Sequence, residues 1–188
     1  MKKVIISMLA VFVLFGCSNN SPKVAEQAAT DMQESPAVIF NDMENALGGI
    51  PSWINEKTIS RMPEGASAHS GIFVTRVDGE DLYSYTFREN FSNINEKLPV
   101  AVIVEGYVFS AENNPSLSVI VDINENNKTV LWKSYALNDV ITNLNQWIPF
   151  AARFSVDTPV SPDYQLKVFG YGGGKVAYFD DLKISFEY

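Results

Sequence analysis

The chain contains one histidine, His69, and one cysteine, Cys17, so few catalytic or metal-binding arrangements are open to it. A zinc site needs thiolates or several histidines, which this sequence does not supply. A Ser-His-Asp triad built on His69 stays open, although neither Ser67 nor Ser70 lies in a nucleophile-elbow motif. We therefore favour a role for His69 in a turn.

Paired carboxylates are a second kind of chemistry, because two of them can hydrolyse a glycosidic bond. Asp180 and Asp181 are neighbours on a predicted strand, where successive side chains point to opposite faces, so they do not form such a pair. Glu105 and Asp122 fall on outward positions of two predicted strands that we expect to be adjacent. A small glycan-cleaving enzyme therefore stays an alternative.

Aromatic side chains offer a non-catalytic route, because ligand sites combine ring faces with a few well-placed polar groups. Tyr107 falls opposite the valine stripe of residues 100–109, and Trp132 lies within residues 130–137. We predict that Trp132 and Tyr107 form an aromatic platform that binds a glycan weakly. The alternative for each ring is packing in the core, since a β-sandwich needs large side chains inside.

The segments that carry these side chains have the composition of β-strands. Segments rich in β-branched and aromatic residues occur at 71–77, 82–87, 100–109, 117–123, 130–137, 148–156, 164–169 and 176–186. Turn signals separate them, including Asp78-Gly79 and the three glycines at 172–174. The spacing predicts an all-β fold, a β-sandwich or jelly roll of roughly 8–10 antiparallel strands.

Alternation within these strands predicts which side chains face the core. Apolar residues at every second position between Leu117 and Ile123 predict one buried face, with Asp122 on the other. By the same alternation Asp180 shares the core side with Leu182. A carboxylate there is costly unless it is paired or bound to a metal ion.

The first 17 residues have the pattern of an export signal. Lys2 and Lys3 precede an apolar run of about a dozen residues, which is too short to span the roughly 30 Å of a bilayer core. The run ends in Leu14-Phe15-Gly16-Cys17, which resembles the lipobox of bacterial lipoproteins. The resemblance implies that residues 1–16 are a signal peptide and that lipidated Cys17 anchors the chain to a membrane. An ordinary secretory signal is the alternative.

The remainder divides into a polar segment and one domain. Residues 17–36 predict a flexible tether, and residues 37–188 are numerous enough to bury a core. The signal holds two of the 14 basic residues, so the mature chain has 12 basic and 22 acidic residues, a net charge of −10. This acidity argues against a nucleic-acid partner. Because Cys17 is the only cysteine, no disulfide stabilises the domain.

Three motifs in the domain resemble the galactose-binding-like jelly roll of many carbohydrate-binding modules. The sequence at 41–44 (NDME) is similar to the opening of that family, and the sequence at 68–74 (AHSGIFV) is similar to its small-x-Ser-Gly entry into a strand. The sequence at 178–184 (YFDDLKI) is similar to its closing strand, and Trp147 fits a tryptophan that precedes a late strand. Met43 replaces the usual phenylalanine.

This resemblance implies that the first and last strands lie side by side and share a structural calcium ion. Glu44 and Asp180 would supply carboxylates, and backbone carbonyls near residues 69–71 would complete the six to eight oxygens that calcium takes. The alternative is that both are surface acids or pair with basic side chains.

We therefore expect a non-catalytic lipoprotein of the cell envelope, anchored on the outer membrane, that binds an oligo- or polysaccharide. The glycan would come from the envelope, the diet or the environment. The main alternative is a structural or protein-binding envelope module of the same fold, with other envelope proteins as partners, since fold alone does not fix function.

Overall fold

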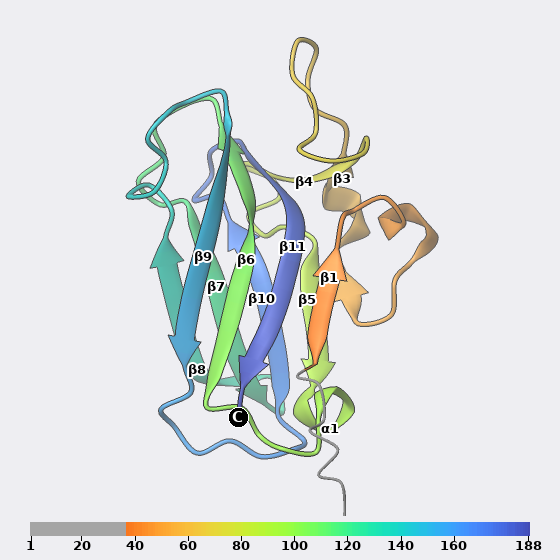
Figure 1. Ribbon diagram of the computed structural model, residues 1–188, viewed down its shortest axis with the longest axis vertical. Coiled ribbons are helices and arrows are strands. Elements are labelled where there is room, and N and C mark those ends of the chain that lie inside the picture. Colours follow the sequence, from red (N-terminus) through yellow and green to blue (C-terminus); the bar gives the residue numbers. More distant parts are fainter. Residues whose placement is uncertain (1–36) are drawn as a thin grey trace, which may run out of the picture. The chain divides into compact units, whose positions relative to one another are not determined.

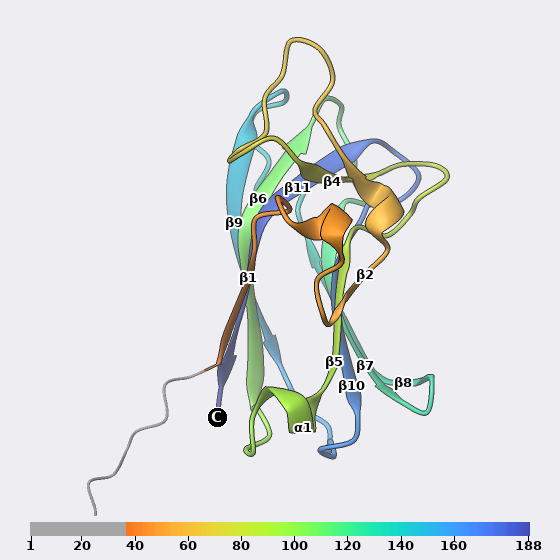
Figure 2. The same cartoon turned by 90° about the vertical axis from the view of Figure 1, so that its right-hand side faces the viewer.

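Strands rich in β-branched and aromatic residues pair antiparallel in two sheets that face each other (Figure 1, Figure 2). The computed structural model describes residues 37–188. The expected signal peptide 1–16, the lipidated Cys17 and the tether 17–36 lie outside the described residues and stay predictions. Across residues 37–188, no helix is both long enough and apolar enough to cross a membrane.

The first sheet has six strands in the order β3-β4-β11-β6-β9, and β1 also pairs with β11. Its strands are β1 (Val38–Asn41), β3 (Ile59–Ser60), β4 (Val74–Val77), β6 (Ala101–Ser110), β9 (Trp147–Ser155) and β11 (Ala177–Glu187). As the sequence resemblance implies, the first and last strands of the domain are neighbours.

The second sheet has five strands in the order β2-β5-β10-β7-β8. Its strands are β2 (Trp53–Ile54), β5 (Thr86–Asn90), β7 (Ser118–Glu125), β8 (Lys128–Ala136) and β10 (Gln165–Tyr171). Short helices η1 (Ala46–Gly48), η2 (Glu56–Thr58) and α1 (Phe91–Ile94) lie in the connections. The predicted all-β sandwich is therefore confirmed.

The core lies between the sheets and follows the predicted alternation. Leu117, just before β7, and the inward side chains of β7 are fully buried: Val119, Val121 and Ile123. From the other sheet, β6, β9 and β11 contribute a matching set that includes Val102, Val104, Phe150, Phe154, Leu182 and Ile184. At Gly170 the sheets leave no room for a side chain, because an added Cβ would lie 2.3 Å from Cε2 of Phe179.

The last strand is irregular at Asp180 and Asp181. Its register with β6 shifts between Asp180 and Lys183, and Asp181 has a φ of 50°. Such a β-bulge inserts an extra residue and re-aims the side chains beside it. Before the bulge β11 pairs with β4, and after it β11 pairs with β1. The bulge therefore places both aspartates where the two partner strands meet.

Candidate functional site

The outer face of the five-stranded sheet is hollowed by a groove of about 620 Å³. Its floor comes from β5, β10, β7 and β8, and one wall comes from the loop at 80–83. A second hollow of about 450 Å³ continues the groove, and both hollows are lined by Tyr83 and Trp132.

Aromatic rings form a connected ridge across this groove. The Trp132 side chain on β8 is 49% exposed, and its ring meets that of Phe169 edge to face at 5.8 Å between centroids. Phe169 in turn meets Tyr83 at 5.2 Å, and Tyr83 meets Tyr171 at 5.8 Å. Tyr83 is 45% exposed, so the ridge presents two open rings that are supported by neighbouring rings.

The strand register places a row of polar side chains beside this ridge. Arg88 on β5 lies opposite Lys167 on β10, Lys167 lies opposite Asp122 on β7, and Asp122 lies opposite Trp132. The Lys167 Nζ is 4.0 Å from the Asp122 carboxylate and 3.3 Å from Oδ1 of Asn124. Asp122 also accepts a hydrogen bond from the Thr129 hydroxyl at 3.1 Å.

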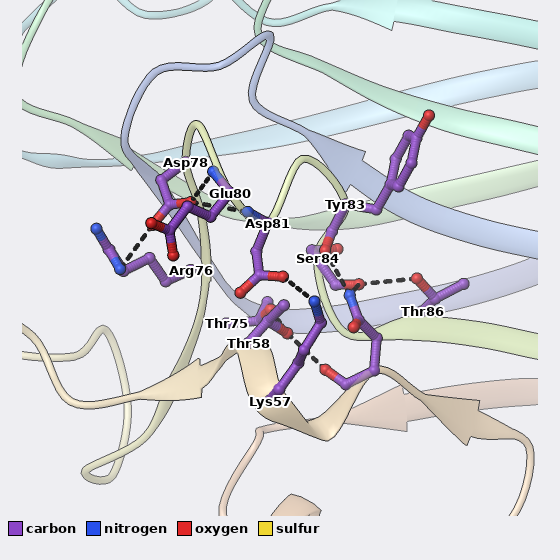
Figure 3. A network of polar contacts seen from close by, with 11 residues as sticks. Lys57, Thr58, Thr75, Arg76, Asp78, Glu80, Asp81, Tyr83, Ser84 and Thr86 are labelled. Atoms are coloured by element: carbon purple, nitrogen blue, oxygen red, sulfur yellow. Dashed lines mark hydrogen bonds and ion pairs between the residues drawn. The ribbon is translucent and has the colours of Figure 1, made fainter.

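The loop that forms the wall is held by its own polar contacts, as Figure 3 shows. Oδ1 of Asp78 accepts the backbone N–H groups of Glu80 and Asp81 at 2.7 and 2.8 Å. These bonds, against a smaller effect of burial, lower the pKa of Asp78. Asp81 pairs with Lys57, and the Asn55 side chain donates to the Tyr83 carbonyl. The wall is thus tied to the segment around η2.

The structure places Tyr107 in the other sheet, so it does not share a platform with Trp132. Tyr107 lies on the outer face of β6, where its ring stacks on His69 at 3.4 Å between centroids. It lines a separate hollow of about 420 Å³ with Phe40 and Lys183. Of the two predicted ligand-binding rings, Trp132 alone lies in the groove.

Glu105 and Asp122 also lie in different sheets. The prediction that their strands are adjacent is wrong, because β6 pairs with β9 and β11 whereas β7 pairs with β8 and β10. Glu105 instead forms an ion pair with Lys183 at 2.7 Å. These two carboxylates therefore do not flank one glycosidic bond.

His69 contacts Asp181 and not a serine. Its Nδ1 is 2.6 Å from Oδ2 of Asp181, and the Ser70 hydroxyl donates to the other carboxylate oxygen at 2.7 Å. Because Ser70 bonds the aspartate directly, these residues do not form the relay of a catalytic triad. Asp181 orders the turn in which the sequence places His69.

Glu44 and Asp180 both bind the backbone of the segment at 69–73. Oδ2 of Asp180 accepts the N–H groups of His69 and Ser70 at 3.0 and 3.1 Å. Oε1 of Glu44 accepts the N–H groups of Ile72 and Phe73 at 2.7 and 2.8 Å. An added Cβ at Gly71 would lie 2.3 Å from this carboxylate, so the segment passes directly over Glu44.

These contacts do not fit the calcium ion that the sequence resemblance implies. N–H groups point their positive ends at both carboxylates, whereas calcium needs oxygen donors. Among residues 37–188, no three acidic, histidine or cysteine side chains gather closely enough to hold a metal ion. Calcium at Glu44 and Asp180 stays a prediction from the sequence, and the described contacts join the first and last strands without it.

Asp180 is fully buried, and this burial raises its pKa to about 6. The N–H bonds from Ser70, Asp181 and His69 lower the pKa, while the Asp181 charge raises it. Burial has the largest effect, so desolvation of the carboxylate outweighs its hydrogen bonds.

The sequence missed Tyr83, Arg88, Lys167 and Phe169 as groove residues. Lys167 and Phe169 alternate with the buried Leu166 and Val168 on β10, so period-two alternation would have found them. Tyr83 carries no such signal, because it joins the sheet through an isolated bridge to Tyr171.

No protein-family model and no curated protein matches the chain. Among solved structures, the chain is similar to two xylan-binding domains of Xyn10C from Paenibacillus barcinonensis. The CBM22-1 domain is 13% identical, with 81% of this chain and 97% of that chain covered and a TM-score of 0.47. The CBM22-2 domain is 17% identical, with 79% and 98% covered and a TM-score of 0.48.

The xylan-binding module CBM15 is 17% identical, with 80% of this chain and 97% of that chain covered and a TM-score of 0.46. The sequence predicted a resemblance to carbohydrate-binding modules, and each of these structures is such a module. The strand pairing described above establishes the β-sandwich independently of these similarities.

Proposed function

We propose that the chain binds a carbohydrate in the groove on the outer face of the five-stranded sheet and does not cleave it. The observation that carries this proposal is the ridge of Trp132, Phe169 and Tyr83 beside a row of polar side chains. Ring faces suit the apolar faces of sugars, and the polar row suits their hydroxyl groups. Trp132 and Phe169 lie on strands, and the Tyr83 ring is supported by contacts with Phe169 and Tyr171.

The extent of the hollowed face favours a chain of sugars over a single one. The two hollows share Tyr83 and Trp132, and a third hollow of about 220 Å³ follows at Asn124. Along β7 the hollows run from Ser118 to Asn124, which is about 20 Å at the usual rise per residue. A face of this length accommodates several linked rings.

The predicted lipid anchor would place this groove at a membrane. With Cys17 lipidated, the tether 17–36 would let the domain reach on the order of 25 Å from the bilayer. Several acyl chains hold a protein firmly, at about 0.8 kcal/mol per buried CH₂. We therefore propose an envelope lipoprotein that retains an oligo- or polysaccharide near the cell.

A glycan array screened with the purified protein tests this function. We expect the wild type to bind one class of glycan at micromolar to millimolar affinity, since a few ring and hydrogen-bond contacts give modest binding. Trp132→Ala should abolish binding. Phe40→Ala is the matched control, because Phe40 is a 57% exposed ring on β1 outside the groove. Retention of no glycan by the wild type would favour the protein-binding alternative.

Tyr107→Ala tests the other face of the sandwich with the same array. Since Tyr107 lies in the six-stranded sheet, its loss should leave binding in the groove unchanged. Loss of binding in this variant and not in Trp132→Ala would move the site to the hollow beside His69.

A further inference from the structure

Two cations face each other on the floor of the groove. Arg88 of β5 and Lys167 of β10 are directly opposite in the antiparallel register, and both line the groove. Like charges in this position destabilise a sheet, because their Cβ atoms lie about 5 Å apart. The fold therefore accepts an unfavourable pair at the place where a ligand would lie.

Arg88 has no partner of its own to offset that cost. Within residues 37–188, its guanidinium makes no hydrogen bond or ion pair, and the side chain is exposed. The neighbouring Glu89 does not serve it, because that carboxylate is bound by Ser52, Asn93 and the Asn90 N–H. Burial would raise the pKa of Glu89, but these bonds lower it, and the Arg88 charge is the weakest cause.

The groups beside Arg88 are also donors. Lys167 lies 3.3 Å from Oδ1 of Asn124, which orients the Asn124 amide. Asn124 is itself buried and lies outside the groove lining, so this contact leaves the Lys167 ammonium at the groove floor. Lys167 therefore presents a second cation beside Arg88.

The remaining charges of the groove largely cancel. Lys57 pairs with Asp81 in the wall, and Asp122 is offset by Lys167 at 4.0 Å. Glu80 in the wall loop adds one exposed carboxylate, so the six charged side chains that line the whole groove sum to zero. On the strands that form the floor, Arg88 is thus a surplus positive charge within a chain whose net charge is −8.

We propose that the groove selects acidic glycans, with the carboxylate of a uronic acid bound by Arg88 and assisted by Lys167. This proposal rests on the proposed function and adds the class of glycan. A carboxylate is favoured over a sulfate ester, because the planar guanidinium fork matches a planar carboxylate with two parallel hydrogen bonds. The bound anion would also separate the two facing cations.

Polygalacturonate and its fully methyl-esterified form provide a matched pair of probes, because they share one backbone and the methyl esters remove its negative charge. Calorimetric titration of the purified wild type should give at least about tenfold tighter binding to the acidic polymer. Arg88→Gln should remove most of that preference, and Arg88→Lys should restore only part, since lysine keeps the charge and lacks the fork.

Two further variants separate charge from ring contacts and from general electrostatics. Trp132→Ala should lose binding to both polymers alike, whatever their charge. Lys128→Gln is the control, because it removes one exposed positive charge outside the groove and should change neither affinity. Arg88→Gln should not lower the melting temperature of the free protein, because it removes a like-charge contact.

Each result bears on the proposal in a different way. Equal affinity for the two polymers, or an unchanged preference in Arg88→Gln, would overturn acidic selectivity while leaving glycan binding intact. Preference for a sulfated galactan over polygalacturonate would overturn the carboxylate assignment. Failure to bind either polymer together with an empty glycan array would instead contradict the proposed function itself.

Discussion

Asp122 of β7 lies directly opposite Trp132 of β8, so the buried carboxylate of the groove and its most exposed ring share one register position. The ring stands over a polar floor and not over the core. Its proposed role in binding and its role in folding can therefore be separated by substitution.

Trp132→Ala should cost little stability, and Trp53→Ala should cost much. Trp53 is 5% exposed and stacks on Tyr85 in the core, where truncation of a large ring typically costs about 3–5 kcal/mol. Trp132 is half exposed, so we expect less than about 2 kcal/mol. Denaturant unfolding of both variants measures the difference. Equal losses would show that Trp132 supports the core.

Chelation decides whether calcium or backbone N–H groups are the partners of Glu44 and Asp180. If the N–H groups suffice, as the described contacts indicate, calcium and chelator should give the same melting temperature. If calcium binds, a hundredfold excess over Kd adds about 2.7 kcal/mol of stability. In that case chelator should lower the melting temperature, and Asp180→Ala should remove the sensitivity.

The raised pKa of Asp180 predicts a pH dependence in the chelated protein. Between the ordinary value of 3.8 and about 6, the folded state binds more protons at this carboxyl than the unfolded state does. Its contribution is therefore fully present below 3.8 and is lost as the pH rises through 6, by on the order of 2–3 kcal/mol.

Asp180→Asn isolates this contribution. Other carboxyls such as Asp78 and Glu89 have lowered pKa values and act in the opposite direction as the pH falls. The difference in unfolding free energy between wild type and variant should therefore shift between pH 4 and pH 7. A difference that is constant over this range would contradict the raised pKa.

Cys17→Ser should release the protein from the membrane fraction. The predicted lipobox would place the lipid on this thiol. Fractionation with detergent partitioning measures the result. A variant that stays in the membrane pellet with unchanged signal processing would contradict the lipoprotein hypothesis.

Alternation in the sequence predicted the long strands, because a buried apolar side chain occurs at every second position in them, as from Leu117 to Ile123. It missed β2 and β3, because two residues are too short to show a period. It also gave the segment at 82–87 as a strand, whereas β5 begins at Thr86. Of the residues before Thr86, Ser84 and Tyr85 are fully buried, whereas Tyr83 is exposed and lines the groove.

The site was harder to predict, because alternation fixes the face of a strand and not the sheet to which the strand belongs. Tyr107 and Trp132 both point outward as expected, but β6 and β8 lie in opposite sheets. Asp180 and Asp181 were expected on opposite faces, and the bulge instead brings both to His69 and Ser70. A local backbone irregularity of this kind leaves no trace in hydrophobic periodicity.

The wall of the groove is made by a loop, while its floor is made by strands. A substitution at the exposed Glu80 would change the groove wall without altering a core contact, because the loop is tied by backbone N–H groups to Asp78. If the groove binds a glycan as proposed, variation at this loop would retune which glycan is held while the sandwich stays intact. An engineer or natural selection could change the specificity of this protein by altering a few loop positions.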